Sequence, residues 1–132
     1  MDKLVSFDFD GTLTKPAVRL YVKTLIEKGI EVHITTSRNS NEVQKNNNWN
    51  DDLFEIADEC GIKKENITFC CMANKSEFLI KKNFIFHLDD DLIELSFIRT
   101  DTEVIPISVF GNNNWRLECE EAIEKNILKN LN

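Results

Sequence analysis

KLVSFDFDGTLT, residues 3–14, joins an apolar run to a pair of carboxylates. The run at 3–9 is nearly continuous in apolar residues, which is typical of a strand covered on both faces of a sheet. Asp8 and Asp10 fall where that strand would leave the sheet, and Gly11 allows a sharp turn and the close approach of a phosphate. Because neighbouring carboxylates repel each other, we expect a cation beside them, and oxygen ligands favour a hard ion such as Mg²⁺.

The rest of the chain alternates apolar runs with helical patterns. The apolar runs predict further strands at 31–36, 67–71, 83–88 and 103–109. The helical patterns predict helices at 16–28, 51–60, 75–82, 92–97 and 115–131. Gly29 and Gly61 should end the first two of these helices. Strands that alternate with helices imply right-handed crossovers, so we predict one α/β domain over residues 1–132, a three-layer sandwich with a five-stranded parallel sheet.

Composition and charge narrow the class of protein. No apolar run in the 132 residues approaches the ~20 residues that span a bilayer, and no signal-peptide pattern opens the chain. We therefore expect a cytoplasmic protein with no membrane partner. The formal net charge of −7 disfavours nucleic-acid binding, which needs clustered Lys and Arg, but leaves a nucleic-acid partner open. The four cysteines form no C-x-x-C pair, which argues against a zinc site and for reduced thiols in the core.

Polar residues recur at the ends of other predicted strands, on the side where open α/β sheets bind ligands. Thr36, followed by Ser37, offers a hydroxyl and backbone N–H groups to a phosphate oxygen. Lys75, at the start of a predicted helix, would favour an anion. The acidic run 89–91 follows an apolar strand and needs a positive partner. Taken singly, each feature has a plainer interpretation. The Asp8 and Asp10 pair could be turn residues and Thr36 a strand-end cap. Lys75 could be a solvated lysine, and the acidic run could cap a helix. Their order and their placement at strand ends agree with a single site.

These segments resemble the four motifs of the haloacid dehalogenase (HAD) superfamily of phosphotransferases. The string DFDGTLT at 8–14 resembles the first motif, D-x-D-G-T-[LV]-[TS]. The string ITTSR at 34–38 resembles the second motif, with Thr36 at the phosphate-binding position. Lys75 suits the third motif, and FHLDDD at 86–91 resembles the acidic fourth. The resemblance extends from residue 5 to about residue 94 and implies a HAD-like Rossmannoid fold.

The resemblance implies a Mg²⁺-dependent phosphomonoester hydrolase. Asp8 would attack phosphorus to form an aspartyl-phosphate, and Asp10 would protonate the leaving group and then activate water. The metal would be held by the Asp8 carboxylate, the Asp10 backbone carbonyl and an acid of the fourth motif. For that acid, Asp90 ranks first, Asp89 second and Asp91 third. The residues expected to bind the transferring phosphoryl group are Gly11, Thr36, Ser37 and Lys75.

Most members of the superfamily carry a cap domain, and this chain has no room for one in either usual place. Only residues 13–30 separate the first motif from the second strand, and only 72–82 separate the third and fourth strands. The site should therefore be open, unless a second copy of the chain covers it as a homo-oligomer.

The acidic charge favours a small phosphorylated substrate, whereas the missing cap favours a macromolecular end. With a macromolecular substrate, the enzyme would be a polynucleotide 3′-phosphatase or a phosphoprotein phosphatase. If lysines 63, 64, 81 and 82 lay near the mouth of the site, they would favour a polymer.

Two non-catalytic alternatives fit the sequence less well. A receiver-like signalling domain needs an aspartate after the third strand, where this chain has CCM at 70–72. A catalytically silent relative would not need Asp8, Asp10 and Lys75 together.

Trp49 and Trp115 lie in asparagine-rich segments on the ligand side, where packing is expected more than substrate contact.

Overall fold

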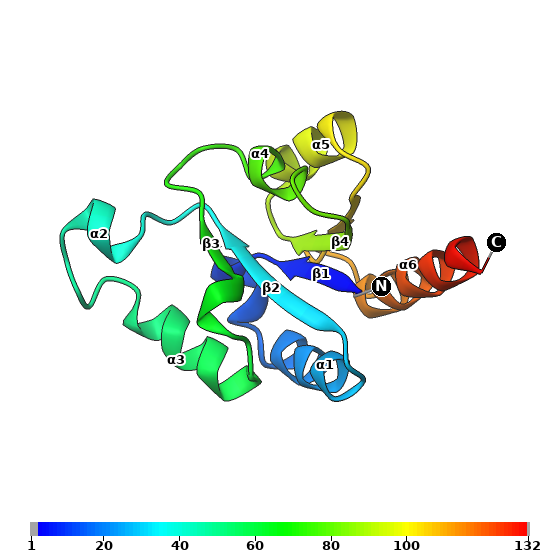
Figure 1. Cartoon of the computed structure of the whole chain (residues 1–132), viewed down its shortest axis with the longest axis horizontal. Helices are drawn as coiled ribbons and strands as arrows, with labels where there is room; N and C mark the ends of the chain where they lie inside the picture. The colour runs from blue at the N-terminus through cyan, green and yellow to red at the C-terminus, as the bar shows by residue number, and fades with distance from the viewer. Residues whose placement is uncertain (1–2, 132) are drawn as a thin grey trace.

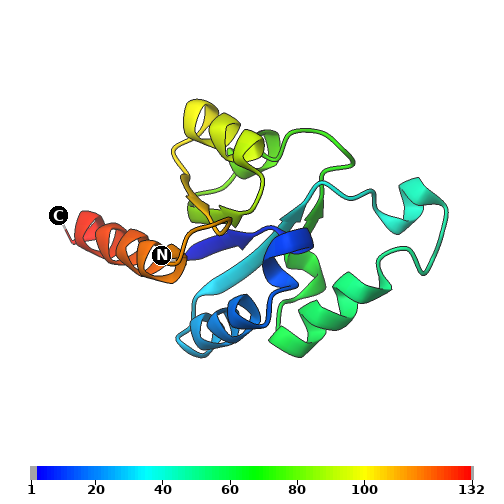
Figure 2. The ribbon, with the colours of Figure 1, turned by 180° about the vertical axis from the view of Figure 1, so that it is seen from behind.

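A computed structural model describes residues 3–131 and contains a five-stranded parallel sheet with helices on both faces (Figures 1 and 2). The strands are β1 (Leu4–Phe7), β2 (Glu31–Thr36), β3 (Ile67–Phe69), β4 (Phe84–Asp89) and β5 (Ile105–Ser108). Their order in the sheet is β3-β2-β1-β4-β5. The predicted α/β sandwich is confirmed, and the described residues hold no inserted cap.

Helices divide between the two faces of the sheet (Figure 1). One face carries α1 (Pro16–Glu27), α3 (Asp51–Cys60) and α6 (Trp115–Asn130), and the other carries α4 (Ser76–Leu79) and α5 (Leu92–Asp101). Phe7 of β1 is fully buried and packs edge-on against Tyr21 of α1 and Phe86 of β4. Burial of the central strand fixes the position of the residue that follows it, Asp8.

Some element boundaries differ from the sequence prediction. β3 ends at Phe69 rather than at 71, because the N–H groups of Cys71 and Met72 bond to the loop after β2. The predicted helix at 75–82 is the single turn α4, and α5 runs to Asp101 instead of 97. A further short helix, α2 (Asn41–Gln44), lies in the polar segment after β2.

Two other expectations can be compared with the structure. The helices before Gly29 and Gly61 end as predicted, and both glycines adopt a positive φ. All four cysteines are free, with Cys71 exposed and the other three buried.

Within residues 3–131, no helix combines the length and the apolar character needed to cross a membrane.

Candidate functional site

The backbone makes a wide turn where β1 ends. This turn, η1 (Phe9–Leu13), is π-helical in its hydrogen bonding, and the N–H of Leu13 donates to the carbonyl of Asp8 at 3.2 Å. Gly11 enters the left-handed region inside the turn, with a φ of 76°. The turn returns Thr12 to Asp8, so that the Thr12 hydroxyl donates to Asp8 Oδ2 at 3.1 Å. Asp8 is thereby held at the carboxyl edge of the sheet with little exposure.

Lys75 is buried between two carboxylates. Its Nζ lies 2.7 Å from Asp8 Oδ1 and 2.6 Å from Asp89 Oδ2. Its backbone N–H donates to Glu94 of α5 at 3.0 Å, which ties the start of α4 to α5. Burial opposes the charged ammonium, but Asp8 and Asp89 outweigh that effect and raise the pKa of Lys75. Lys75 is therefore a charged core residue of the site and not a solvated lysine.

Hydrogen bonds run beneath the site from β2 to β4. Thr35 and Ser6 share a hydroxyl–hydroxyl bond of 2.8 Å, and the Ser6 hydroxyl lies 2.8 Å from Nδ1 of His87. Burial lowers the pKa of His87, so the ring is neutral; Nδ1 then accepts from Ser6, and Nε2–H donates to Asp89 at 2.8 Å. Burial opposes ionisation of Asp89, but His87 and Lys75 outweigh it and hold the pKa of Asp89 below its usual range. Asp89 is thus a fixed negative charge.

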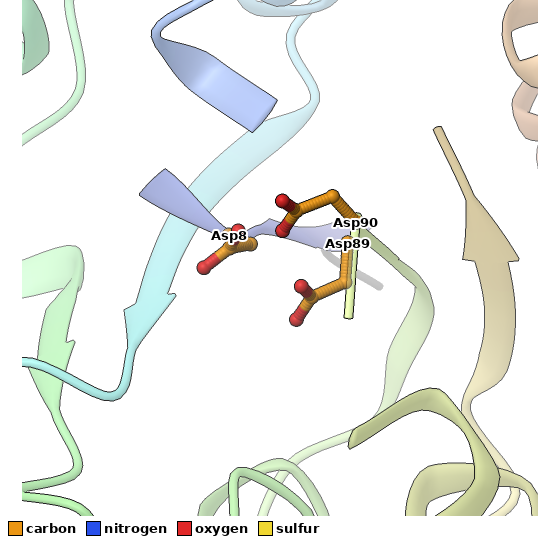
Figure 3. A group of neighbouring side chains, drawn as sticks. All are labelled: Asp8, Asp89 and Asp90. Carbon is orange, nitrogen blue, oxygen red and sulfur yellow. The ribbon is translucent and has the colours of Figure 1, made fainter. Parts of the chain in front are cut away.

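Asp8, Asp89 and Asp90 form an acidic group, drawn in Figure 3. One carboxylate oxygen from each lies within 4.8 Å of the others. Asp8 and Asp89 are buried, whereas Asp90 is partly open to solvent. Asp90 packs against Gly11, where an added Cβ would lie 2.2 Å from Asp90 Oδ2. A set of oxygen ligands with this spacing can hold a hard metal ion.

The charges within the acidic group do not balance. Two buried carboxylates, Asp8 and Asp89, share the one ammonium of Lys75. Burial, followed by the charge of Asp89, raises the pKa of Asp8 to about 8, against the opposing effect of Lys75. A metal ion beside Asp8 would favour the ionised carboxylate, which is the form that can act as a nucleophile.

The acidic run 89–91 divides into three different environments. Asp89 is fully engaged, since its other oxygen accepts the N–H of Asp91 at 3.0 Å. Asp90 lies beside Asp8. Asp91 accepts the N–H groups of Ile93 and Glu94 at 2.9 and 3.2 Å and caps α5. Asp91 is therefore occupied as a helix cap and is not a member of the acidic group, while the ranking of Asp90 before Asp89 as the metal ligand stays a prediction.

The carboxylate of Asp10 lies outside the acidic group and is held by Arg38. Nε and one terminal nitrogen of Arg38 donate to the two oxygens of Asp10 at 2.9 and 2.8 Å. Arg38 also forms a two-bond pair with Asp52 of α3 at 2.8 and 2.9 Å. The guanidinium stacks 4.8 Å above the centre of the Phe9 ring. The Asp10 carboxylate is therefore positioned by the loop after β2.

Thr36 and Ser37 lie at the end of β2. Because Phe7 pairs with Ile34, Asp8 is level with Thr35, and Thr36 follows one residue beyond. Thr36 is buried, and its hydroxyl oxygen accepts the N–H of Arg38 at 3.2 Å. Its hydroxyl proton remains available to a ligand.

A cleft of about 600 Å³ opens beside Arg38. Its lining residues are Ser37, Arg38, Asn39, Asn48, Trp49, Asp52 and Met72. Trp49 therefore lies at a cleft, whereas Trp115 packs edge-on against Tyr21 as expected. A hollow of about 910 Å³ lies elsewhere, at the amino ends of β4 and β5 and along α6, and includes none of the site residues.

Sequence reasoning gave no role to Arg38, Asp52 or His87. For His87, a signal was present, because a polar residue two positions before Asp89 in a strand shares its face of the sheet. Asp52 gave no signal, since its pairing depends on how the loop 37–50 folds back onto the sheet.

Comparisons with known proteins give little support to any family. No protein-family model matches the chain, and no curated protein matches it. One similar solved structure is a hypothetical protein from Xanthomonas campestris, at 19% identity over 81% of this chain with a TM-score of 0.49. The chain spans 63% of the length of that protein. A likeness of this size bears on neither family nor function.

Proposed function

We propose that this protein is a Mg²⁺-dependent phosphomonoester hydrolase of the HAD type, which carries the phosphoryl group on Asp8. The observation that supports the proposal best is the buried Asp8 carboxylate, bonded to Lys75 and adjacent to Asp89 and Asp90 at the carboxyl edge of the sheet. Carboxylates that crowd together with too little positive charge to balance them are typical of functional sites.

The proposed reaction has two steps. In the first, an Asp8 oxygen attacks phosphorus, the bond from phosphorus to the ester oxygen breaks, and Asp10 gives its proton to the departing alkoxide. In the second, water loses a proton to Asp10 and attacks phosphorus, which releases inorganic phosphate and restores the Asp8 carboxylate. Lys75 offsets the charge on the phosphoryl oxygens and on Asp8, and the Thr36 hydroxyl donates to a phosphoryl oxygen.

Mg²⁺ suits the donor atoms of the acidic group. Asp8 and Asp90 would hold the ion, with the Asp10 backbone carbonyl as a further ligand, and Asp89 would add charge while bonded to His87 and Lys75. When bound, the ion would supply positive charge near the phosphoryl oxygens.

Substitution of the nucleophile tests the proposal directly. We expect Asp8→Asn to lower the turnover of para-nitrophenyl phosphate by at least about a thousandfold, because the amide cannot form the acyl-phosphate. Asp58→Asn, the same change on the exposed surface of α3, is the matched control and should leave turnover unchanged. Mass spectrometry of the acid-quenched wild type should show a phosphoryl adduct on Asp8. Near-normal turnover by Asp8→Asn would refute the assignment.

The partner in this proposal is a phosphorylated substrate, either a small molecule or a macromolecular end. If a second copy of the chain covers the site, sedimentation should show a dimer whose dissociation changes the substrate range.

A further inference from the structure

We propose that the cleft beside Arg38 binds the nucleobase of a nucleotide whose phosphate lies at Asp8. This inference rests on the proposed function, because it identifies the leaving group of that reaction. The cleft and the site share Arg38, which lines the cleft and bonds to Asp10, the proposed proton donor. A leaving group protonated by Asp10 would therefore extend into the cleft.

Two apolar side chains from separate loops border the cleft. Trp49 is 46% exposed and Met72 is 76% exposed, and both line the cleft. Trp49 lies in the segment that extends beyond the end of β2 through α2 (Figure 1). A flat aromatic ring would bury both side chains, through stacking on Trp49 and contact with the Met72 sulfur.

The backbone around Met72 is held in an unfavourable conformation. Cys71 and Met72 both have a positive φ, of 50° and 71°, which residues other than glycine rarely adopt. Their N–H groups donate to the carbonyls of Arg38 and Ser37 at 3.1 and 2.9 Å. The loop after β3 is thereby fastened to the loop after β2, and this fastening keeps an exposed methionine at the cleft. Strain retained beside a reactive centre is typical of a functional surface.

The charges in the cleft favour a neutral occupant. Arg38, the cation of the cleft wall, is already paired with two carboxylates, Asp10 and Asp52. Asp52 also lines the cleft and neutralises this guanidinium, so the lining residues offer no unpaired cation to a second phosphate or to a carboxylate on the leaving group. A base is uncharged, and it presents donors and acceptors to neutral amides. Asn48 supplies a side-chain amide and Ser37 a hydroxyl, and neither side chain has a hydrogen-bond partner among residues 3–131.

The base could come from a free nucleotide or from the end of a polynucleotide. Lysines 63 and 64 precede β3, and lysines 81 and 82 precede β4, so both pairs lie toward the amino edge of the parallel sheet. The carboxyl edge therefore lacks these four lysines, which would have contacted the phosphates of a polymer. This placement favours the free nucleotide.

A series of substrates with and without a nucleobase tests whether the cleft binds the base. With Mg²⁺ present, kcat/KM should be compared for nucleoside 5′- and 3′-monophosphates, ribose 5-phosphate and a 3′-phosphorylated oligonucleotide. We expect a nucleoside monophosphate to exceed ribose 5-phosphate by at least about tenfold, and Trp49→Ala to remove most of that advantage by raising KM. Trp49→Phe should restore it, and ribose 5-phosphate should be hydrolysed equally by all three proteins. If the oligonucleotide is preferred, the base site stands and its source is a polymer end.

A binding measurement separates failure of the cleft from failure of the proposed function. In a Trp115→Phe background, which leaves Trp49 as the remaining tryptophan, a nucleoside monophosphate should quench fluorescence more strongly than ribose 5-phosphate. Quenching without hydrolysis of any substrate would support the base site and refute the phosphatase. Hydrolysis that ignores the base, without quenching, would refute the base site and leave the phosphatase intact.

Discussion

At the scale of single residues, Asp8 combines burial with unbalanced charge. We expect the metal-free Asp8→Asn variant to be more stable than the wild type by about 2 kcal/mol near pH 8. The pKa of Asp8 is raised from 3.8 to about 8 on folding, so its contribution to stability is complete below about pH 4 and is lost as pH rises through 8. The two proteins should therefore converge in acid.

Thermal denaturation in a chelator at about pH 4, 6 and 8 measures this difference. Added Mg²⁺ should raise the melting temperature of the wild type and have a much smaller effect on Asp8→Asn. A variant that is less stable than the wild type at pH 8 without metal would show that the Asp8–Lys75 pair outweighs the cost of burial.

Gly11 is the second residue whose exchange has a defined outcome. Gly11→Ala should weaken Mg²⁺ binding by about tenfold or more, because the new Cβ would occupy the space of the Asp90 carboxylate. Gly29→Ala is the matched control: Gly29 also has a positive φ, of 84°, but nothing lies within 4 Å of its added Cβ.

Both glycine variants should lose about 1 kcal/mol of stability from the left-handed backbone, whereas only Gly11→Ala should change the Mg²⁺ titration. Calorimetric titration with Mg²⁺ distinguishes them. Equal affinities in the two variants would show that Asp90 does not bind the ion.

At the scale of elements, the end of β4 and the start of α5 assign different tasks to neighbouring carboxylates. Asp90→Asn should abolish most of the Mg²⁺-induced rise in melting temperature, whereas Asp91→Asn should preserve it, since asparagine caps a helix about as well as aspartate. Asp91→Ala removes the cap from the N–H groups of Ile93 and Glu94 and should cost about 1 kcal/mol, again without loss of the Mg²⁺ response. The opposite pattern would move the metal ligand to Asp91.

The acidic run also shows how far sequence reasoning could reach within an element. The sequence places this run at the end of a strand, because the nearly continuous apolar residues before it are typical of a parallel strand buried on both faces. Which of the three carboxylates faces Asp8 depends on where β4 ends and α5 begins. That boundary is set by the bond from Asp91 N–H to Asp89 and by the cap that Asp91 provides. Interactions of this kind leave no periodic signal in the sequence.

Arg38 illustrates the same limit for a loop. Its position directly after Thr36 was visible, but its partner Asp52 is 14 residues further along, beyond the short helix α2. The folding of such a polar segment depends on local caps and side-chain amides, among them the bonds of Asn50 with Asn39 and Asn41. The sequence alone could not show that Arg38 would hold Asp10 in place.

At the scale of the whole molecule, the fold was predictable because its signals are long-range and redundant. Five apolar runs, separated by helical patterns, admit few arrangements other than a parallel sheet. The order β3-β2-β1-β4-β5 places β1 at the centre, so Asp8 follows the central strand of the sheet. The same topology separates the acidic carboxyl edge from lysines 63, 64, 81 and 82.

The net charge of −7 determines how kcat/KM should depend on salt. A phosphorylated small substrate approaches a protein of the same sign, so kcat/KM should rise about twofold when monovalent salt increases from about 20 to about 200 mM, because screening weakens the repulsion. Mg²⁺ must be saturating throughout, since salt would otherwise act by displacing the ion. The melting temperature over the same range serves as the control for effects on folding. A steep fall in kcat/KM with salt would indicate counterion release from a polymeric substrate, and would favour a polynucleotide end over a free phosphomonoester.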